Sequence, residues 1–364
     1  MIRVPITVPS HLYHAVIETG LVERAGQHLR PVLKDTGRLF VVSTRTVNRK
    51  WGKKLLGSLS SADFDTKLLE MPEGERHKRL ATIERLAERL SALGADRSSA
   101  LLAFGGGVVG DVTGLLASLY MRGVEVVQIP TTVLAQVDAS IGGKTGVNLR
   151  AGKNLLGTFH QPRAVLIDPT VLSTLPEREF RAGLYEALKC GVIGRPELFN
   201  GLEKLDTKAL RRDPARLEWV IAEAVKLKAE VVSCDERESG LRRVLNFGHT
   251  IGHALEAESG YRRFLHGEAV AWGMIAAAQI ATATGTCTAD TTRRITTAVL
   301  ALGPLPKVSA TGQSILRLLQ ADKKTRNGVV HFVLPQAIGK VEVLNDVPEK
   351  VVVAAVDGLR RLSP

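Results

Sequence analysis

The chain has 364 residues, which exceeds what one hydrophobic core usually supports, so two domains are expected. Hydrophobic residues make up 45% and charged residues 24%, as is ordinary for a globular protein. The formal net charge of +12 suggests an acidic partner, but the basic residues are dispersed and aromatic residues are only 4%. We therefore expect a basic cleft for a phosphorylated or carboxylated metabolite, with no nucleic-acid partner.

The cysteines and the N-terminus indicate the compartment. Cys190, Cys234 and Cys287 are odd in number and far apart, which argues against a disulfide framework and for a reducing compartment. The first ten residues, MIRVPITVPS, lack the apolar core of a signal peptide. The longest apolar run, residues 269–285, is too short to cross a bilayer. We expect a cytoplasmic protein that is not bound to a membrane.

The first half of the chain alternates between strand and helix patterns. Strands are expected at residues 4–8, 14–18, 39–44, 67–71, 100–104, 124–129 and 164–167, and helices at 21–33, within 72–93, and at 111–120. The first two strands form an opening hairpin or edge strands. The alternation that follows indicates a parallel sheet with crossover helices.

A glycine turn, GGGVVGD at residues 105–111, lies between an expected strand and an expected helix. It satisfies the pattern G-x-G-x-x-G, in which backbone N–H groups and a helix N-terminus face a pyrophosphate. A tight strand-to-helix turn explains the glycines equally well. An ordinary Rossmann domain carries this fingerprint on its first strand, so we expect a Rossmann-like nucleotide-binding α/β domain of unusual order.

Residues 131–162 are rich in glycine and carry Asp138, Lys144, Lys153 and Asn154 in what reads as irregular backbone. Loops of this composition often hold polar groups against a ligand. A connection without a function is the alternative interpretation.

The second half reads as mainly helical. Helices are expected at 177–191, 216–234, 246–258, 268–284 and 291–302, and two late strands at 329–334 and 339–344 are expected to pair as a hairpin. We place the domain boundary after the last strand of the first half. This gives a nucleotide-binding domain at 1–171 and a mainly helical metal- and substrate-binding domain at 172–364.

Three of the nine histidines lie within eighteen residues of one another. His249 and His253 are four apart, so on a helix capped by Asn246 they project from one face. His266 comes from a different element. Imidazoles from two helices, with a carboxylate supplied elsewhere, suit a zinc ion with one open position. Histidines satisfied in the core or on the surface are the alternative, and spacing alone also allows His249 and His253 to chelate together.

Glu186 and Lys189 lie three apart near one face of the first expected helix of the second half. A surface ion pair explains this spacing. A metal-binding carboxylate beside a substrate lysine explains it as well, and spacing does not decide between them.

Several motifs recur in an order and spacing that match a known family. They are PEGE (72–75), GGGVVGD (105–111), MRG (121–123), IPTTVLAQVDASIGGKTGVN (129–148), KNLLGTFHQP (153–162), EALK (186–189), LRRVLNFGHTIGHALE (241–256), HGEAV (266–270) and DKK (322–324). From about residue 5 to residue 347, the chain resembles the 3-dehydroquinate synthases, a family of sugar-phosphate cyclases of the shikimate pathway.

The resemblance implies a metal and a dinucleotide. Glu186, His249 and His266 would bind Zn²⁺ or Co²⁺, and His253 would serve substrate phosphate and proton transfer instead. The residues that match NAD positions are Thr44, Glu75, Lys78, Gly106, Gly107, Asp111, Thr131, Thr132, Lys144 and Lys153. Many relatives carry an acid where this chain has Thr44 and Arg45, and an arginine tolerates the 2′-phosphate of NADP, so the choice between NAD and NADP stays open.

The resemblance also implies a substrate and a reaction. The substrate, 3-deoxy-D-arabino-heptulosonate 7-phosphate, would be converted to 3-dehydroquinate and phosphate by transient oxidation, β-elimination, reduction and intramolecular aldol closure. The residues implied around it are Asp138, Lys144, Asn154, Lys189, Lys228, Arg242, Asn246, His253, Lys323 and Lys324. In a homodimer, Arg122 would reach the neighbouring subunit's site. The alternatives are an aminodehydroquinate or valiolone-type synthase and a metal-dependent polyol dehydrogenase.

Overall fold

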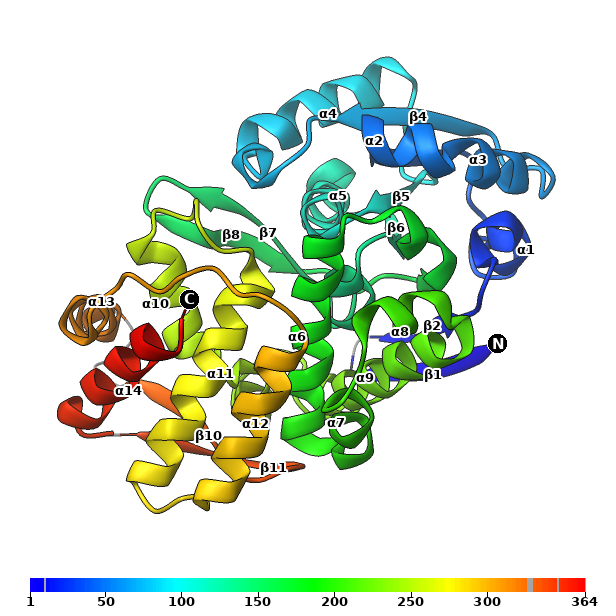
Figure 1. Cartoon of the computed structure of the whole chain (residues 1–364). Coiled ribbons are helices and arrows are strands. Elements are labelled where there is room, and N and C mark those ends of the chain that lie inside the picture. Colours follow the sequence, from blue (N-terminus) through cyan, green and yellow to red (C-terminus); the bar gives the residue numbers. More distant parts are fainter. Residues whose placement is uncertain (10, 326–329, 346, 364) are drawn as a thin grey trace. The chain divides into compact units, whose positions relative to one another are not determined.

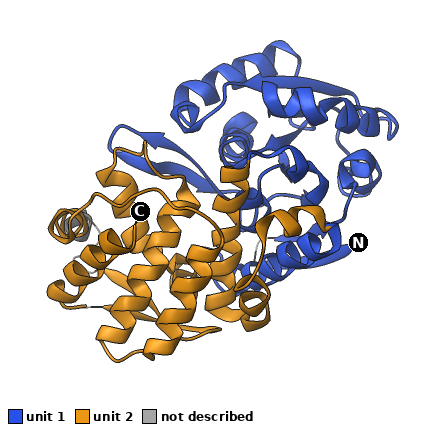
Figure 2. Cartoon of the chain, in the orientation of Figure 1, with its two compact units in different colours: residues 1–176, 214–237 blue, residues 177–213, 238–364 orange. Residues whose placement is uncertain are grey.

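The computed structural model describes the chain except residues 10, 326–329, 346 and 364, and except the side chains of residues 322–325. The chain forms two compact units, Met1–Pro176 with Pro214–Arg237 and Glu177–Asp213 with Glu238–Pro364 (Figure 2). The boundary drawn from the sequence after residue 171 lies close to the first change of unit. The segment Pro214–Arg237, drawn from the sequence in the second domain, packs in the first unit.

The first unit contains a seven-stranded sheet in the order β1-β2-β9-β6-β5-β3-β4. Among the described strands of this sheet, only β1 and β2 pair antiparallel, which confirms the opening hairpin, and the remaining pairs are parallel as expected. The strands are β1 (Ile2–Val8), β2 (His11–Ile17), β3 (Leu39–Thr44), β4 (Thr66–Met71), β5 (Ala100–Gly105), β6 (Glu125–Pro130) and β9 (Ala164–Ile167). Every residue of β3, β5 and β9 is buried, which explains their unbroken apolar runs.

The strand order reverses between β3 and β5. From β3 the chain proceeds to β4 on one side, whereas β5 pairs with the other side of β3 and leads on to β6. Ligands of open parallel sheets bind beyond the carboxyl ends of the strands at such a reversal. Thr44 ends β3 and Gly105 ends β5. The glycine turn therefore lies at the reversal, although it is far from the N-terminus.

Helices of the first unit differ from expectation at their ends, and the helical stretch of residues 45–60 was not predicted at all. The helix expected within 72–93 begins only at Leu80 because a separate helical turn precedes it, and the helix expected at 21–33 ends at Leu29. The helices are η1 (Leu21–Arg24), α1 (Ala25–Leu29), α2 (Arg45–Val47), η2 (Asn48–Gly52), α3 (Lys53–Ser60), η3 (Glu75–His77), α4 (Leu80–Ala92), α5 (Gly107–Leu119), η4 (Tyr120–Arg122), η5 (Ala135–Ala139), η6 (Pro169–Thr174) and α9 (Pro214–Cys234).

Half of the glycine-rich segment expected to be irregular, residues 144–159, is an antiparallel hairpin. Strands β7 (Lys144–Leu149) and β8 (Gly152–Phe159) pair with each other and pack against α5 (Figure 1). The two strands approach each other so closely that a Cβ added at Gly157 would lie 2.0 Å from the carbonyl oxygen of Thr145. The prediction of irregular backbone was wrong for these two strands, where Gly157 serves strand contact. Gly142 and Gly143, which precede β7, have left-handed φ values of 93° and 65°, as turn residues do.

The second unit is mainly helical, as expected. Its elements are α6 (Glu177–Gly194), α7 (Pro196–Leu202), α8 (Thr207–Arg212), η7 (Leu241–Asn246), α10 (His249–Glu258), α11 (His266–Ala283), α12 (Ala289–Ala301), α13 (Gly312–Thr325), α14 (Glu349–Leu362), β10 (His331–Ala337) and β11 (Lys340–Asn345). The late hairpin is confirmed, with its expected first residue, 329, outside the described residues. Helix α11 is almost wholly buried, and α6, α10, α12 and α14 pack around it. None of the helices in the described parts of the chain is long and apolar enough to cross a membrane.

Glycines set the distance between α10 and α11. A Cβ at Gly273 would lie 1.8 Å from the carbonyl oxygen of Gly248, and one at Gly252 would lie 2.9 Å from the carbonyl oxygen of Ala269. Gly248 precedes α10 in a left-handed conformation with φ of 79°. Asn246 was expected to cap this helix, but it ends η7 instead. The two helices that carry the histidines are therefore in backbone contact.

We predict that Gly273→Ala destabilises the second unit by roughly 1–3 kcal/mol, because the added methyl overpacks against backbone that cannot rotate away. The matched control is Gly57→Ala in α3, where the added Cβ meets nothing within 4 Å. The control should stabilise its helix by roughly 0.5–1 kcal/mol. Urea unfolding of both variants measures this, and equal unfolding midpoints would contradict the close approach.

Candidate active site

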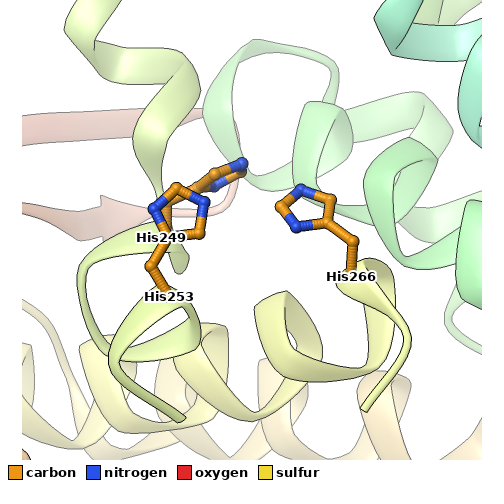
Figure 3. A group of neighbouring side chains, drawn as sticks. All are labelled: His249, His253 and His266. Atoms are coloured by element: carbon orange, nitrogen blue, oxygen red, sulfur yellow. The ribbon is translucent and has the colours of Figure 1, made fainter. Parts of the chain in front are cut away.

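Three imidazoles of the second unit face one another (Figure 3). His249 and His253 extend from α10, and His266 faces them from the first position of α11. One ring nitrogen of each residue lies within 4.8 Å of the others, and the centroid distances are 5.1, 5.2 and 5.6 Å. His253 is exposed, whereas His249 and His266 are partly buried. The sequence prediction that two helices bring these side chains together is confirmed.

Each of the two less exposed imidazoles has a partner behind it. Nδ1 of His249 lies 3.2 Å from the carbonyl oxygen of Phe247, and Nδ1 of His266 lies 3.3 Å from Oε2 of Glu256. Both contacts leave Nε2 to face a ligand.

The same surroundings separate the pKa values of the two rings. Burial, together with the charges of Lys189 and the other imidazoles, holds the pKa of His249 well below its ordinary value. Burial alone would lower the pKa of His266, but the hydrogen bond to Glu256 and the charge of Glu186 outweigh it and raise that pKa. His249 is therefore neutral at pH 7, the form in which imidazole binds a metal.

Glu186, on α6, is completely buried beside this group. Its Oε1 lies 3.6 Å from Nε2 of His266, and its Oε2 lies 2.5 Å from Nζ of Lys189. The second distance makes an ion pair, yet neither carboxylate oxygen has a well-directed hydrogen bond among the described residues. Burying a carboxylate whose oxygens lack hydrogen bonds costs free energy, and a bound cation offsets that cost. The surface ion pair considered from the sequence is excluded, since both side chains are buried.

The contact between α6 and α11 fixes His266 relative to Glu186. A Cβ at Gly267 would lie 1.8 Å from the carbonyl oxygen of Ala182, so only glycine fits after His266. Arg178 of α6 binds both carboxylate oxygens of Glu268, at 2.6 and 2.7 Å, and Glu268 also accepts a hydrogen bond of 2.8 Å from the backbone of Leu265. These contacts hold the start of α11 against α6.

The donor set fits a zinc or cobalt ion. Imidazole nitrogen and carboxylate oxygen are donors that both ions accept, and three protein ligands leave a position for substrate. Geometry alone groups the three histidines, whereas the sequence resemblance selects Glu186, His249 and His266. Because Glu186 also lies beside His266, either His253 or Glu186 can be the third ligand. Measuring metal binding by variants of the two residues decides between them.

Other residues expected near the substrate occupy varied positions in the second unit. Arg242 is buried in η7, and Nδ2 of Asn246 donates a 2.8 Å hydrogen bond to Glu238. Lys323 and Lys324 belong to α13, in the stretch whose side chains lie outside the described structure.

A polar network occupies the first unit beside the glycine turn. Nζ of Lys78 lies 2.5 Å from Oδ2 of Asp111 and also donates to Oδ1 of Asn154. The side chain of Asn148 donates to Oε1 of Glu75 at 2.7 Å and accepts from the backbone N–H of Asn154 at 2.9 Å. Burial raises the pKa of Asp111, although Lys78 acts against it. The five residues therefore form one connected group of hydrogen bonds and charges.

Asn148 belongs to this network but is not among the residues expected at a site from the sequence, although it closes the motif at 129–148. Its backbone N–H donates to the carbonyl oxygen of Lys78 at 2.8 Å, and its side chain joins Glu75 to Asn154. Asn154 itself has a left-handed φ of 56°. The signal available in the sequence was a pair of asparagines six residues apart, each close to a lysine and to glycines.

The remaining residues expected at the dinucleotide surround the ends of the sheet strands. Gly106 precedes α5 as its N-cap, where a Cβ would lie 3.0 Å from Thr132, and a Cβ on Gly107 would lie 3.4 Å from Ala139. Thr131 donates its N–H to the carbonyl oxygen of Gly105 at 2.9 Å, and the hydroxyl of Thr132 accepts from the N–H of Ala135 at 3.1 Å. Thr44 caps α2. Backbone N–H groups at the start of α5 thus lie at the sheet reversal, as an anion site requires.

Five further expected residues also belong to the first unit. Nζ of Lys228, on α9, donates to the backbone oxygen and to Oδ1 of Asp138, at 2.6 and 2.5 Å. Lys144 is exposed, Lys153 is partly exposed, and both have polar contacts. Arg122 is exposed and has a left-handed φ of 69°.

The sequence is similar to one enzyme family along most of its length. Residues 68–182 match a family model described as "3-dehydroquinate synthase N-terminal", and residues 183–325 match one described as "3-dehydroquinate synthase C-terminal". A curated protein of Koribacter versatilis named 3-dehydroquinate synthase is 53% identical over 363 residues, which cover 100% of this chain and 99% of that protein.

Two solved structures are similar in fold and in sequence. The 2-epi-5-epi-valiolone synthase of Streptomyces hygroscopicus subsp. jinggangensis, solved with NAD⁺ and Zn²⁺, gives a TM-score of 0.88 at 34% identity over 96% of this chain and 97% of that one. A 2-deoxy-scyllo-inosose synthase, complexed with carbaglucose-6-phosphate, NAD⁺ and Co²⁺, gives a TM-score of 0.84 at 26% identity over 99% of both chains.

We predict that His249→Ala and Glu186→Gln lose a zinc ion on dialysis that the unsubstituted chain retains, whereas His253→Gln retains it. The first two variants remove a donor atom, and the third removes a neighbour of the ion. Metal analysis after gel filtration measures the content. Loss from His253→Gln with retention by Glu186→Gln would show that the three histidines are the ligands instead.

Proposed function

The chain belongs to the 3-dehydroquinate synthase family, and we propose that it acts as a phosphate-eliminating lyase that converts 3-deoxy-D-arabino-heptulosonate 7-phosphate to 3-dehydroquinate. The observation that carries this proposal is the convergence of His249, His266 and buried Glu186, in a chain 53% identical to a named 3-dehydroquinate synthase.

The free cysteines support a reducing compartment, the cytoplasm.

Glu186, His249 and His266 would hold the divalent ion. The ion supplies Lewis acidity, which lowers the pKa of a coordinated hydroxyl group. Lys189, beside Glu186, adds a positive charge where an oxyanion develops. His253 is exposed next to these ligands and is assigned to the substrate phosphate, where its ring can pass a proton. The base that removes the proton in the elimination is either His253 or the substrate phosphate itself.

The first unit would bind NAD. The dinucleotide supplies a hydride acceptor that is regenerated within each turnover. The start of α5, with Gly106 and Gly107, would bind the pyrophosphate through backbone N–H groups. Lys78 is paired with Asp111 in the network beside it, so its ammonium is held in one place. Arg45 is exposed next to Thr44, and an arginine tolerates the 2′-phosphate of NADP, so both NAD and NADP should be assayed.

The two anionic ends of the substrate require fixed cations. Arg242 is assigned to the carboxylate because a guanidinium binds carboxylate with two parallel hydrogen bonds. Its burial in η7 limits the orientations open to the guanidinium. In the first unit, Lys228 holds Asp138 by two contacts, and we assign this pair to the substrate hydroxyl groups.

A second candidate function is that of another sugar-phosphate cyclase. The 34% identity to a solved 2-epi-5-epi-valiolone synthase favours this candidate. Arg242 and Asn246, together with His253, favour the carboxylated heptulosonate. A metal-dependent polyol dehydrogenase has no need for so many phosphate-binding groups.

We predict that the chain, with catalytic NAD and Zn²⁺, releases phosphate from 3-deoxy-D-arabino-heptulosonate 7-phosphate without net accumulation of NADH. Phosphate release and absorbance at the NADH band measure the two quantities. Faster release from sedoheptulose 7-phosphate would favour the second candidate. Stoichiometric NADH from a simple polyol would favour a dehydrogenase.

We also propose that the protein is a homodimer in which Arg122 serves the neighbouring subunit's site. Exposed apolar side chains accompany Arg122 in the first unit, among them Leu119, Met121 and Phe159. The hydroxyl of Thr158 donates to that of Ser118 at 2.9 Å, which holds the end of β8 beside the end of α5. An exposed apolar patch of this kind supports an interface between two copies.

Mixing two inactive variants tests this assignment. Arg122→Ala subunits have an intact metal site, and His249→Ala subunits have an intact Arg122, so each heterodimer would contain one complete site. After refolding or exchange of an equal mixture, activity should recover to about one quarter of the unsubstituted level, since about half of the dimers are mixed. Failure to recover any activity in verified heterodimers would contradict a shared site.

A further inference from the structure

The carboxylate of Glu256 has none of the roles assigned so far, yet it contacts His266, one of the proposed metal ligands. Glu256 is 2% exposed on α10, one turn beyond His253, and its Oε2 lies 3.3 Å from Nδ1 of His266. A buried carboxylate is costly without a hydrogen-bonded partner. Its contact with His266 therefore helps to stabilise the carboxylate in its buried position.

The chemistry of this contact determines which nitrogen of His266 is available. An ionised carboxylate only accepts hydrogen bonds, so Nδ1 of His266 must carry the proton in the contact. In the neutral ring, Nε2 then keeps its lone pair. Nε2 is the nitrogen that lies 3.6 Å from Oε1 of Glu186. The nitrogen prepared for a metal is thus the one that faces the other expected ligand.

His249 provides an internal comparison. Its Nδ1 lies 3.2 Å from the backbone oxygen of Phe247, a neutral acceptor. His266 is backed by a full negative charge instead. A carboxylate behind an imidazole both orients the ring and increases its basicity as a ligand. The two rings are oriented by different kinds of acceptor, and only that of His266 can be altered by substituting a side chain.

We propose that Glu256 is a positioning residue that fixes the tautomer and orientation of His266 and thereby sets the affinity of the site for a divalent cation. The inference rests on the proposed metal centre, and it assigns to Glu256 no contact with substrate. The start of α11 is held separately by Arg178 and Glu268, so removal of Glu256 releases the ring and leaves the backbone of His266 in place.

The test measures Zn²⁺ affinity of the full chain by competition with a chromogenic chelator. Glu256→Ala removes both the acceptor and the charge, and should weaken Zn²⁺ binding about 100-fold; Glu256→Gln keeps an acceptor without the charge, and should weaken it about 10-fold. The matched control is Glu258→Gln, which removes an exposed carboxylate from the same helix and should leave the affinity unchanged.

A second readout separates positioning from a merely structural role. The visible absorption of bound Co²⁺ reports the ligand geometry, and it should change in Glu256→Ala and not in Glu258→Gln. Affinity and Co²⁺ spectrum unchanged in a folded Glu256→Ala would overturn the proposal, even if the metal-free protein became less stable. If Glu256→Ala does not fold, the affinity of Glu256→Gln decides in the same way. Failure of the unsubstituted chain to bind Zn²⁺ would instead refute the proposed metal centre.

Discussion

The second unit is organised around a carboxylate that water does not reach. Glu186 is fully buried, and one cationic side chain, Lys189, lies against it. Removing an ion from water costs several kcal/mol, which a pair of charges offsets only when the geometry is well fixed. The backbone contacts of Gly267 and Gly273 give α11 one position relative to α6 and α10. A divalent cation bound by Glu186 and the imidazoles would supply the positive charge that this arrangement favours.

Much of the fold follows from local patterns in the sequence. The bounds of β3 and β9 agree with prediction because a short apolar run between polar turns has few other ways to bury its side chains. The histidine cluster was also predictable, since His249 and His253 at a spacing of four share a helix face and His266 begins the next helix.

The errors arise where tertiary contacts overrule local preference. The hairpin of β7 and β8 was read as irregular because its glycines resemble loop residues, whereas Gly157 permits close approach of the strands. Helix α9 packs in the first unit because it contacts β1 and η5, partners that are distant in the sequence. The contact of Glu256 with His266 links α10 and α11. It depends on how the two side chains are oriented, so it could not be predicted from their spacing in the sequence.

Anomalous diffraction at the zinc edge, from crystals of the full chain grown with Zn²⁺, tests the central claim most directly. The peak should lie about 2.0–2.2 Å from Nε2 of His249, Nε2 of His266 and a carboxylate oxygen of Glu186. A peak bound to other residues, or no peak at this cluster with Zn²⁺ in excess, would contradict the claim that these side chains are arranged to hold a metal.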